Sequence, residues 1–141
     1  MSLQMRKKLS ENFTLGEFVK QDLKGWKQLG DETRGLLMER LQLLADELEV
    51  LRTHIGGPIV ITSGWRSPLH NRSVGGSTTS DHPRGFGCDF QRPGLKPQYI
   101  FERCRFLHSH ALMHLDQCIL YPAHVHVGIG PRRRGQFFVS Q

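Results

Sequence analysis

Leucine recurs along the first third of the chain at the spacing of one helix face. Between about residues 32 and 54, apolar residues occur at Leu36, Leu37, Leu41, Leu44, Leu48 and Leu51. Steps of three and four residues place side chains on the same side of an α-helix. The run from Gly56 to Pro58 ends the pattern, because proline cannot continue a helix. We therefore predict one long amphipathic helix with a buried leucine face.

Two further helices are predicted by shorter patterns. Thr14 and Glu17 have the spacing of a capping box, which starts a short helix. Residues 97–110 form the second of these helices. Residues 25–31 are predicted to be a loop, and so is the longer segment 63–80, which is rich in Gly, Ser, Thr and Asn. A loop of that length in a compact domain is usually functional.

The remaining apolar runs are short and typical of strands. We expect strands at residues 59–61, 87–90, 118–120 and 124–129, and residues 136–139 are expected either to add an edge strand or to pack on the sheet. A turn at residues 121–123 joins the third and fourth of them. Helices followed by a block of strands indicate an α+β fold, with a small antiparallel sheet flanked by helices.

The length of 141 residues suits one domain with its own core. We place this domain at residues 1–141, with its core at about 13–130, and expect a monomer. The sequence shows neither an apolar run that could span a bilayer nor a secretory leader, so synthesis in the cytoplasm is expected. Cys88, Cys104 and Cys118 are odd in number and lack C-x-x-C spacing, which predicts reduced, buried thiols.

The formal net charge is +6, and part of the excess lies in residues 6–8 and 132–134. A nucleic-acid ligand is one interpretation. However, the sequence contains no recognition helix, zinc-finger spacing or interleaved aromatic and basic residues, so no specific nucleic acid is expected. An anionic polymer such as a cell wall fits the charge equally well, because this attraction is long-range and non-specific. A solvated basic surface without any partner is the third interpretation.

The candidate chemistry lies in two segments of the second half of the chain. His82 and Asp89 are seven residues apart, and Gly85 and Gly87 between them permit a tight path that brings both side chains together. Downstream, His124 and His126 alternate with valines, so a strand places both imidazoles on one face.

Two or three histidines with one carboxylate are a common way to hold catalytic Zn²⁺ with a position left for water. A single histidine is more often a surface or core residue, and the other five histidines of the chain have no such context. A further candidate is Arg66, directly after a predicted buried strand. Its guanidinium can bind a substrate carboxylate through two parallel hydrogen bonds, or it is a solvated loop residue.

Several short motifs occur in a specific order along the chain. They are Ser63-Gly-Trp-Arg-Ser-Pro68, Asn71-Arg72, Val74-Gly-Gly76, Ser80-Asp-His82, Gly85, Asp89-Phe90, Asp116-Gln117 and His124-Val-His-Val127. Together they resemble the zinc D-alanyl-D-alanine peptidase family, which includes D-alanyl-D-alanine carboxypeptidases, vancomycin-resistance dipeptidases and phage endolysins. The resemblance covers about residues 13–129 and is strongest to short, single-domain phage and prophage members. It implies the fold that this family shares with the hedgehog signalling domain.

The resemblance also implies roles for individual residues. Three residues match the ligands of one zinc ion: His82, Asp89 and His126. By position, Arg66 matches the arginine that binds the terminal carboxylate of the substrate, and Ser80 matches a serine beside the metal. The implied substrate is a peptidoglycan peptide, cut next to D-amino acids by a carboxypeptidase or a wall endopeptidase. Action on the cell wall during phage lysis is implied as well.

The chain departs from the family pattern at the general base. Many short relatives carry Glu where this chain has Tyr121, and others carry Asp where it has Ala123. The candidates for the base are therefore His124, Asp116 or a carboxylate from elsewhere, and Tyr121 is a further candidate for contacting the substrate through its hydroxyl. The alternative is a catalytically degenerate relative that binds zinc and serves as a wall-peptide or phage-particle binding module.

Overall fold

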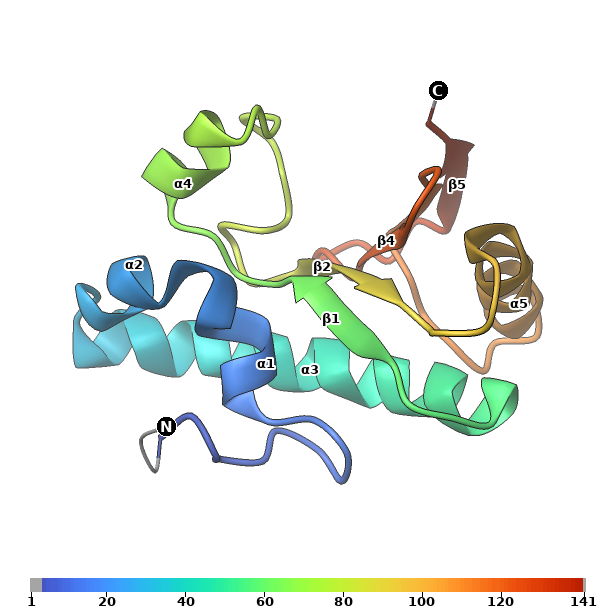
Figure 1. Cartoon of the computed structure of the whole chain (residues 1–141), viewed down its shortest axis with the longest axis horizontal. Coiled ribbons are helices and arrows are strands. Elements are labelled where there is room, and N and C mark those ends of the chain that lie inside the picture. Colours follow the sequence, from blue (N-terminus) through green and yellow to red (C-terminus); the bar gives the residue numbers. More distant parts are fainter. Residues whose placement is uncertain (1–3, 141) are drawn as a thin grey trace.

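The computed structural model describes residues 4–140 (Figure 1), so residues 1–3 and 141 of the expected domain lie outside the described part. The helical elements are α1 (Leu15–Val19), the 3₁₀ turn η1 (Lys20–Asp22), α2 (Leu23–Lys27), α3 (Asp31–Ile55), α4 (Pro68–Ser73) and α5 (Pro97–Ser109). The strands are β1 (Val60–Ser63), β2 (Gly87–Gln91), β3 (Gln117–Leu120), β4 (Val125–Gly128) and β5 (Gln136–Val139). This arrangement confirms the α+β fold.

The five strands form one sheet in the order β1-β2-β4-β3-β5. The first three contacts in that order are antiparallel, as expected, but β5 runs parallel to β3. The sheet is therefore mixed, because the chain crosses from β4 past its hairpin partner β3 and adds β5 on the outer side. Figure 1 shows α3 on one side of β1 and β2, and α4 on the other.

The long helix α3 supplies much of the core. Its buried residues are Leu37, Leu41, Leu44, Ala45, Leu48 and Leu51, which confirms the predicted leucine face. Leu36 is the exception at 48% exposed, because adjacent helix positions point about 100° apart. The helix ends where expected, with Gly56 in the left-handed conformation and its N–H bonded to the Arg52 carbonyl.

Two predicted loops contain short helices. Helix α2 overlaps the predicted loop 25–31, and its N-terminus is capped by the Asp22 side chain. Helix α4 lies inside the predicted loop 63–80 and is started by Ser67, whose side chain accepts the His70 N–H, with Pro68 at the first helical position. These helices have five and six residues, too few for an apolar period to emerge in the sequence.

Two local predictions from the sequence, a capping box and buried cysteines, are confirmed. Thr14 and Glu17 form the predicted capping box at α1. All three cysteines are buried free thiols. Among the helices of residues 4–140, none combines the length and the apolar character needed to cross a membrane.

Asp22 joins the N-terminal helices to the loop that carries the candidate residue Arg66. Its carboxylate accepts the Gly25 N–H at 3.1 Å and the Ser67 N–H at 2.8 Å. Burial acts to raise the pKa of Asp22, but the hydrogen bonds from Ser67 and Gly25 outweigh it, so the pKa lies below its ordinary value. The ionised form therefore stabilises the fold, and this contribution is lost as the pH falls through the lowered pKa.

We predict that Asp22→Ala lowers the free energy of unfolding by about 1–2 kcal/mol at pH 7, because both backbone donors lose their acceptor. Urea unfolding at a series of pH values checks this, and the difference from the unmodified protein should shrink below pH 4. The control is Asp31→Ala, which removes an exposed ion pair with Arg34 and should change stability by less than about 0.5 kcal/mol. A deficit for Asp22→Ala that is independent of pH would contradict the role of the charge.

Candidate metal centre

The register of β2 and β4 creates the centre of the site. It places Asp89 directly opposite His126, and the Asp89 Oδ1 lies 2.8 Å from the His126 Nδ1. On the other face of the same strands, Cys88 and Val127 are paired and fully buried. Because side chains alternate along a strand, burial of the valine and cysteine face directs the polar pair to the opposite face.

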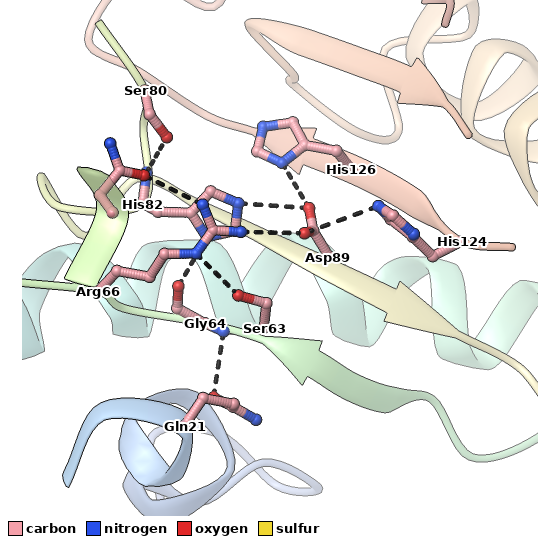
Figure 2. A network of polar contacts seen from close by, with 10 residues as sticks. Gln21, Ser63, Gly64, Arg66, Ser80, His82, Asp89, His124 and His126 are labelled. Carbon is pink, nitrogen blue, oxygen red and sulfur yellow. Dashed lines mark hydrogen bonds and ion pairs between the residues drawn. The ribbon is translucent and has the colours of Figure 1, made fainter. Parts of the chain in front are cut away.

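His82 reaches this pair from the turn that precedes β2. Its Nε2 lies 3.3 Å from the Asp89 Oδ1, and its Nδ1 lies 2.7 Å from the Gly64 carbonyl oxygen (Figure 2). A carbonyl can only accept, so the Nδ1 must donate and carries the hydrogen. In the neutral ring, the lone pair is then on the Nε2 and is available to a metal ion, whereas in the protonated ring the Nε2 donates to Asp89.

The carbonyl of Gly64 is itself held in place by the N-terminal helices. A Cβ on Gly64 would lie 2.1 Å from the Phe18 carbonyl oxygen, so only glycine fits. The next residue, Trp65, donates its N–H to that same oxygen at 2.6 Å. Gln21 accepts the Gly64 N–H at 3.2 Å, as Figure 2 shows. The orientation of His82 therefore depends on packing between α1 and the end of β1.

These three side chains have the geometry of a metal site. One ligand atom from each of His82, Asp89 and His126 lies within 4.8 Å of the other two. A tetrahedral ion with bonds of about 2.1 Å separates its ligand atoms by roughly 3.4 Å, which lies within that limit. Burial acts to raise the pKa of Asp89, but hydrogen bonds from His126 and His82 hold that pKa well below its ordinary value, so the carboxylate is ionised. The three residues could therefore hold a metal ion.

Arg66 lies beside this cluster. Its Nη2 is 3.4 Å from the Asp89 Oδ2, its Nε donates to Ser63 at 3.1 Å, and its Nη1 donates to Asn71 at 3.0 Å. Asn71 in turn donates to the Ser77 carbonyl, so it braces the arginine against the loop after α4. The guanidinium is thus held on the metal side of the sheet.

The cluster borders a polar cleft with a volume of about 330 Å³. The cleft is also lined by residues of the loop that leads to His82 and by Gln117 and Ile119 of β3. Ser80 and Tyr121, both predicted site residues, line the cleft together with Arg66. The Ser80 Oγ also accepts the His82 N–H at 3.2 Å.

His124 approaches Asp89 from the opposite side to His82. Its Nε2 lies 3.6 Å from the Asp89 Oδ2, and its ring stacks on Tyr121 with centroids 4.6 Å apart and planes 16° apart. Burial raises the pKa of Tyr121, the Asp89 carboxylate raises it further, and Arg66 opposes them. The phenol is therefore protonated at neutral pH and can donate a hydrogen bond.

Asp116 is not brought to this group. Its carboxylate accepts two hydrogen bonds from the Arg134 guanidinium, at 2.8 and 3.0 Å, and one from the Arg134 N–H. These bonds from Arg134 are the main reason that the pKa of Asp116 lies below its ordinary value. The structure thus gives Asp116 a partner near the start of β5, whereas His82, Asp89, His124 and His126 converge.

Sequence reasoning missed three residues that shape the site. Gly64 orients His82, Asp81 is a buried acid lining the cleft, and Ile119 on β3 forms part of its wall. The sequence signal that could have identified Gly64 is its position between a predicted buried strand and a tryptophan. Asp81 was adjacent to a predicted ligand, but a pattern cannot distinguish a buried acid from an exposed one.

We predict that the protein binds one divalent metal ion per chain and that His82→Ala abolishes stoichiometric binding. Metal analysis after dialysis measures this directly. His114→Ala is the matched control, since its side chain is exposed, and it should bind as the unmodified protein does. Full metal occupancy in His82→Ala would exclude His82 as a ligand.

Comparison with known proteins agrees with this geometry. No curated protein matches the chain. The model of the Peptidase M15 family matches residues 11–128, which include every residue of the convergent group. That match covers most of the chain, and therefore the protein belongs to the Peptidase M15 family, the zinc D-alanyl-D-alanine peptidases that its motifs resemble.

Proposed function

We propose that this protein is a zinc-dependent peptidoglycan peptidase. It hydrolyses peptide bonds next to D-amino acids, as a D-Ala-D-Ala carboxypeptidase or as a wall endopeptidase. The observation that carries the proposal is the convergence of His82, Asp89 and His126 at a polar cleft in a chain of the Peptidase M15 family. The ion is one Zn²⁺, because two imidazoles and one carboxylate suit zinc and leave a fourth tetrahedral position open. Residues 1–141 act as a single domain.

When bound, zinc supplies Lewis-acid chemistry to the scissile carbonyl and to a water molecule. We assign substrate binding to Arg66 and Ser80. The guanidinium has five N–H donors, and its contacts with Ser63, Asn71 and Asp89 use one from each nitrogen. Two N–H groups remain for the carboxylate of a peptide. The hydroxyl of Ser80 accepts from His82, which leaves its own hydrogen for the substrate.

Proton transfer is assigned to His124. Its imidazole lies beside Asp89, on the opposite side to His82 (Figure 2), and a neutral imidazole at this place has a lone pair that can accept a proton from the attacking water. Tyr121 is stacked against it. Its hydroxyl donates a hydrogen bond to the substrate oxygen that becomes negative as the carbonyl is attacked.

A second candidate function is a zinc-binding wall-peptide or phage-particle binding module without turnover. The favouring observation is the replacement of the family's glutamate by Tyr121. The carboxylates that line the cleft, Asp81 and Asp89, are both engaged in ion pairs with arginines. A carboxylate held in this way is a poor proton acceptor.

The proposed setting is the cell wall during phage lysis, after synthesis in the cytoplasm. The partner is a peptidoglycan peptide, with no specific nucleic acid, and the protein acts as a monomer. The net positive charge of +6 supports attraction to an anionic wall.

The proposal is tested with zinc-loaded protein on peptides that end in D-Ala-D-Ala and on cross-linked wall peptides. Cleavage of the first group only identifies a carboxypeptidase, and cleavage of internal bonds identifies an endopeptidase. Protein that is loaded with zinc, binds these peptides and cleaves none of them supports the binding module instead.

We predict that Arg66→Lys raises KM for a carboxylate-ended peptide by about tenfold to a hundredfold, because an ammonium cannot make two parallel hydrogen bonds. Steady-state kinetics on such a peptide and on its C-terminal amide check this, since the amide should lose much less. Arg72→Lys, on the exposed side of α4, is the control and should behave as the unmodified protein. An unchanged KM in Arg66→Lys would exclude this role.

The identity of the base generates a further prediction. His124→Ala should lower kcat by about 10² to 10⁴ while zinc content stays at one per chain, because the variant loses the proton acceptor and no ligand. Asp116→Asn should keep both zinc and activity, since Asp116 is bonded to Arg134. Rate and metal content are measured on the same samples. Loss of activity in Asp116→Asn with normal zinc content would identify Asp116, and not His124, as the general base.

A further inference from the structure

Asp81 is a buried acid beside the proposed metal centre to which the proposed function gives no role. It is only 7% exposed and lines the cleft next to His82. Its Oδ1 accepts a hydrogen bond from the Arg84 guanidinium at 3.0 Å, and the Arg84 side chain is half exposed. That contact accounts for one oxygen of the carboxylate, so the surroundings of the other oxygen decide what the residue can do.

Two glycines make room for the second oxygen. The Asp81 Oδ2 lies 2.1 Å from the point where a Cβ would stand on Gly128, and the Asp81 Cβ lies 2.8 Å from the corresponding point on Gly87. Any side chain at Gly128 would therefore displace this carboxylate. Neither glycine has the positive φ that would require glycine for conformational reasons. The space that they leave is filled by Asp81.

The same space borders the ring of His126. Its Nε2 lies 3.6 Å from the Cβ point of Gly128, and its Cε1 lies 3.0 Å from that of Gly87. The Nδ1 of His126 faces Asp89, so the Nε2 is the ring nitrogen turned toward Asp81. The Nε2 and the Asp81 Oδ2 are therefore neighbours of the same glycine position, at 3.6 and 2.1 Å from its Cβ point, and no direct hydrogen bond joins them. Polar atoms placed in this way can be bridged by one water molecule.

We infer that Asp81 is a positioning residue for His126 and accepts the hydrogen of the His126 Nε2 through one bridging water. A histidine that binds metal through one nitrogen almost always donates its other N–H to a carboxylate, a carbonyl or water. That bond fixes the tautomer and the angle of the ring and makes the ligand nitrogen more basic. The inference rests on the proposed metal site and adds a contact that raises the affinity of this site for zinc.

The test measures zinc affinity by competition with a chelator. Asp81→Asn keeps the shape and removes the charge, and Asp81→Ala removes the acceptor, so affinity should fall by about tenfold and up to a hundredfold respectively. Arg84→Gln is the matched control. It removes the other partner of Asp81, and affinity should stay within about twofold if the carboxylate acts through His126 and not through the ion pair.

A second variant keeps the inference falsifiable if Asp81→Ala folds poorly. Gly128→Ala leaves Asp81 in the chain but pushes its carboxylate away, so it should lower zinc affinity as Asp81→Ala does. Combined with Asp81→Ala it should add little further loss, because both changes remove one interaction. The visible spectrum of the Co²⁺-substituted protein should shift in Asp81→Asn, since the ring of one ligand is freed to turn.

The outcomes separate the two proposals. Unmodified protein that binds no metal overturns the proposed function and this inference with it. Unmodified protein that binds zinc, with affinity and Co²⁺ spectrum unchanged in Asp81→Asn and in Gly128→Ala, overturns the inference alone. Equal losses in Arg84→Gln and Asp81→Asn would also overturn it, because the ion pair would then explain the effect.

Discussion

The site depends on one carboxylate that is surrounded by nitrogen atoms of four side chains. Asp89 is approached by His126 at 2.8 Å, His82 at 3.3 Å, Arg66 at 3.4 Å and His124 at 3.6 Å. Burying a carboxylate without such partners costs free energy, because the charge loses its contact with water. The surrounding segments supply partners that offset this cost. These partners come from β4 and its leading turn, from the turn before β2 and from the loop after β1. The single charge therefore fixes how these parts of the chain meet.

One residue at which this chain departs from its family pattern contacts the proposed base. Tyr121 stands where short relatives have glutamate, and its ring stacks on His124. The Tyr121 N–H also bonds to the His124 carbonyl, so the turn between β3 and β4 holds both residues. The acidic side chain of the family pattern is thus replaced by a phenol that is neutral at pH 7 and lines the cleft. The electrostatic field that a substrate meets is correspondingly more positive, because Arg66 remains in place.

Much of the fold and of the metal centre could be predicted from the sequence, because both rest on periodicity. The leucine spacing located α3, and the two-residue alternation around Val125 placed His124 and His126 on one face. Other features rest on close approach, which leaves no periodic pattern. Gly64 is needed because of the Phe18 carbonyl, and Gly128 leaves room for Asp81. The parallel pairing of β5 depends on a crossing over β3 that the local sequence does not encode.

The cross-strand pair of Asp89 and His126 has a consequence for the order of events during synthesis. Its members are 37 residues apart, and the Gln21 contact that supports Gly64 spans 43 residues. Contacts at such separations form slowly, because long loops must close first. In zinc fingers, by contrast, nearby ligands allow the metal to drive folding. Here the three candidate ligands cannot meet until β4 has emerged from the ribosome, so a nascent chain that ends before β4 has no complete metal centre.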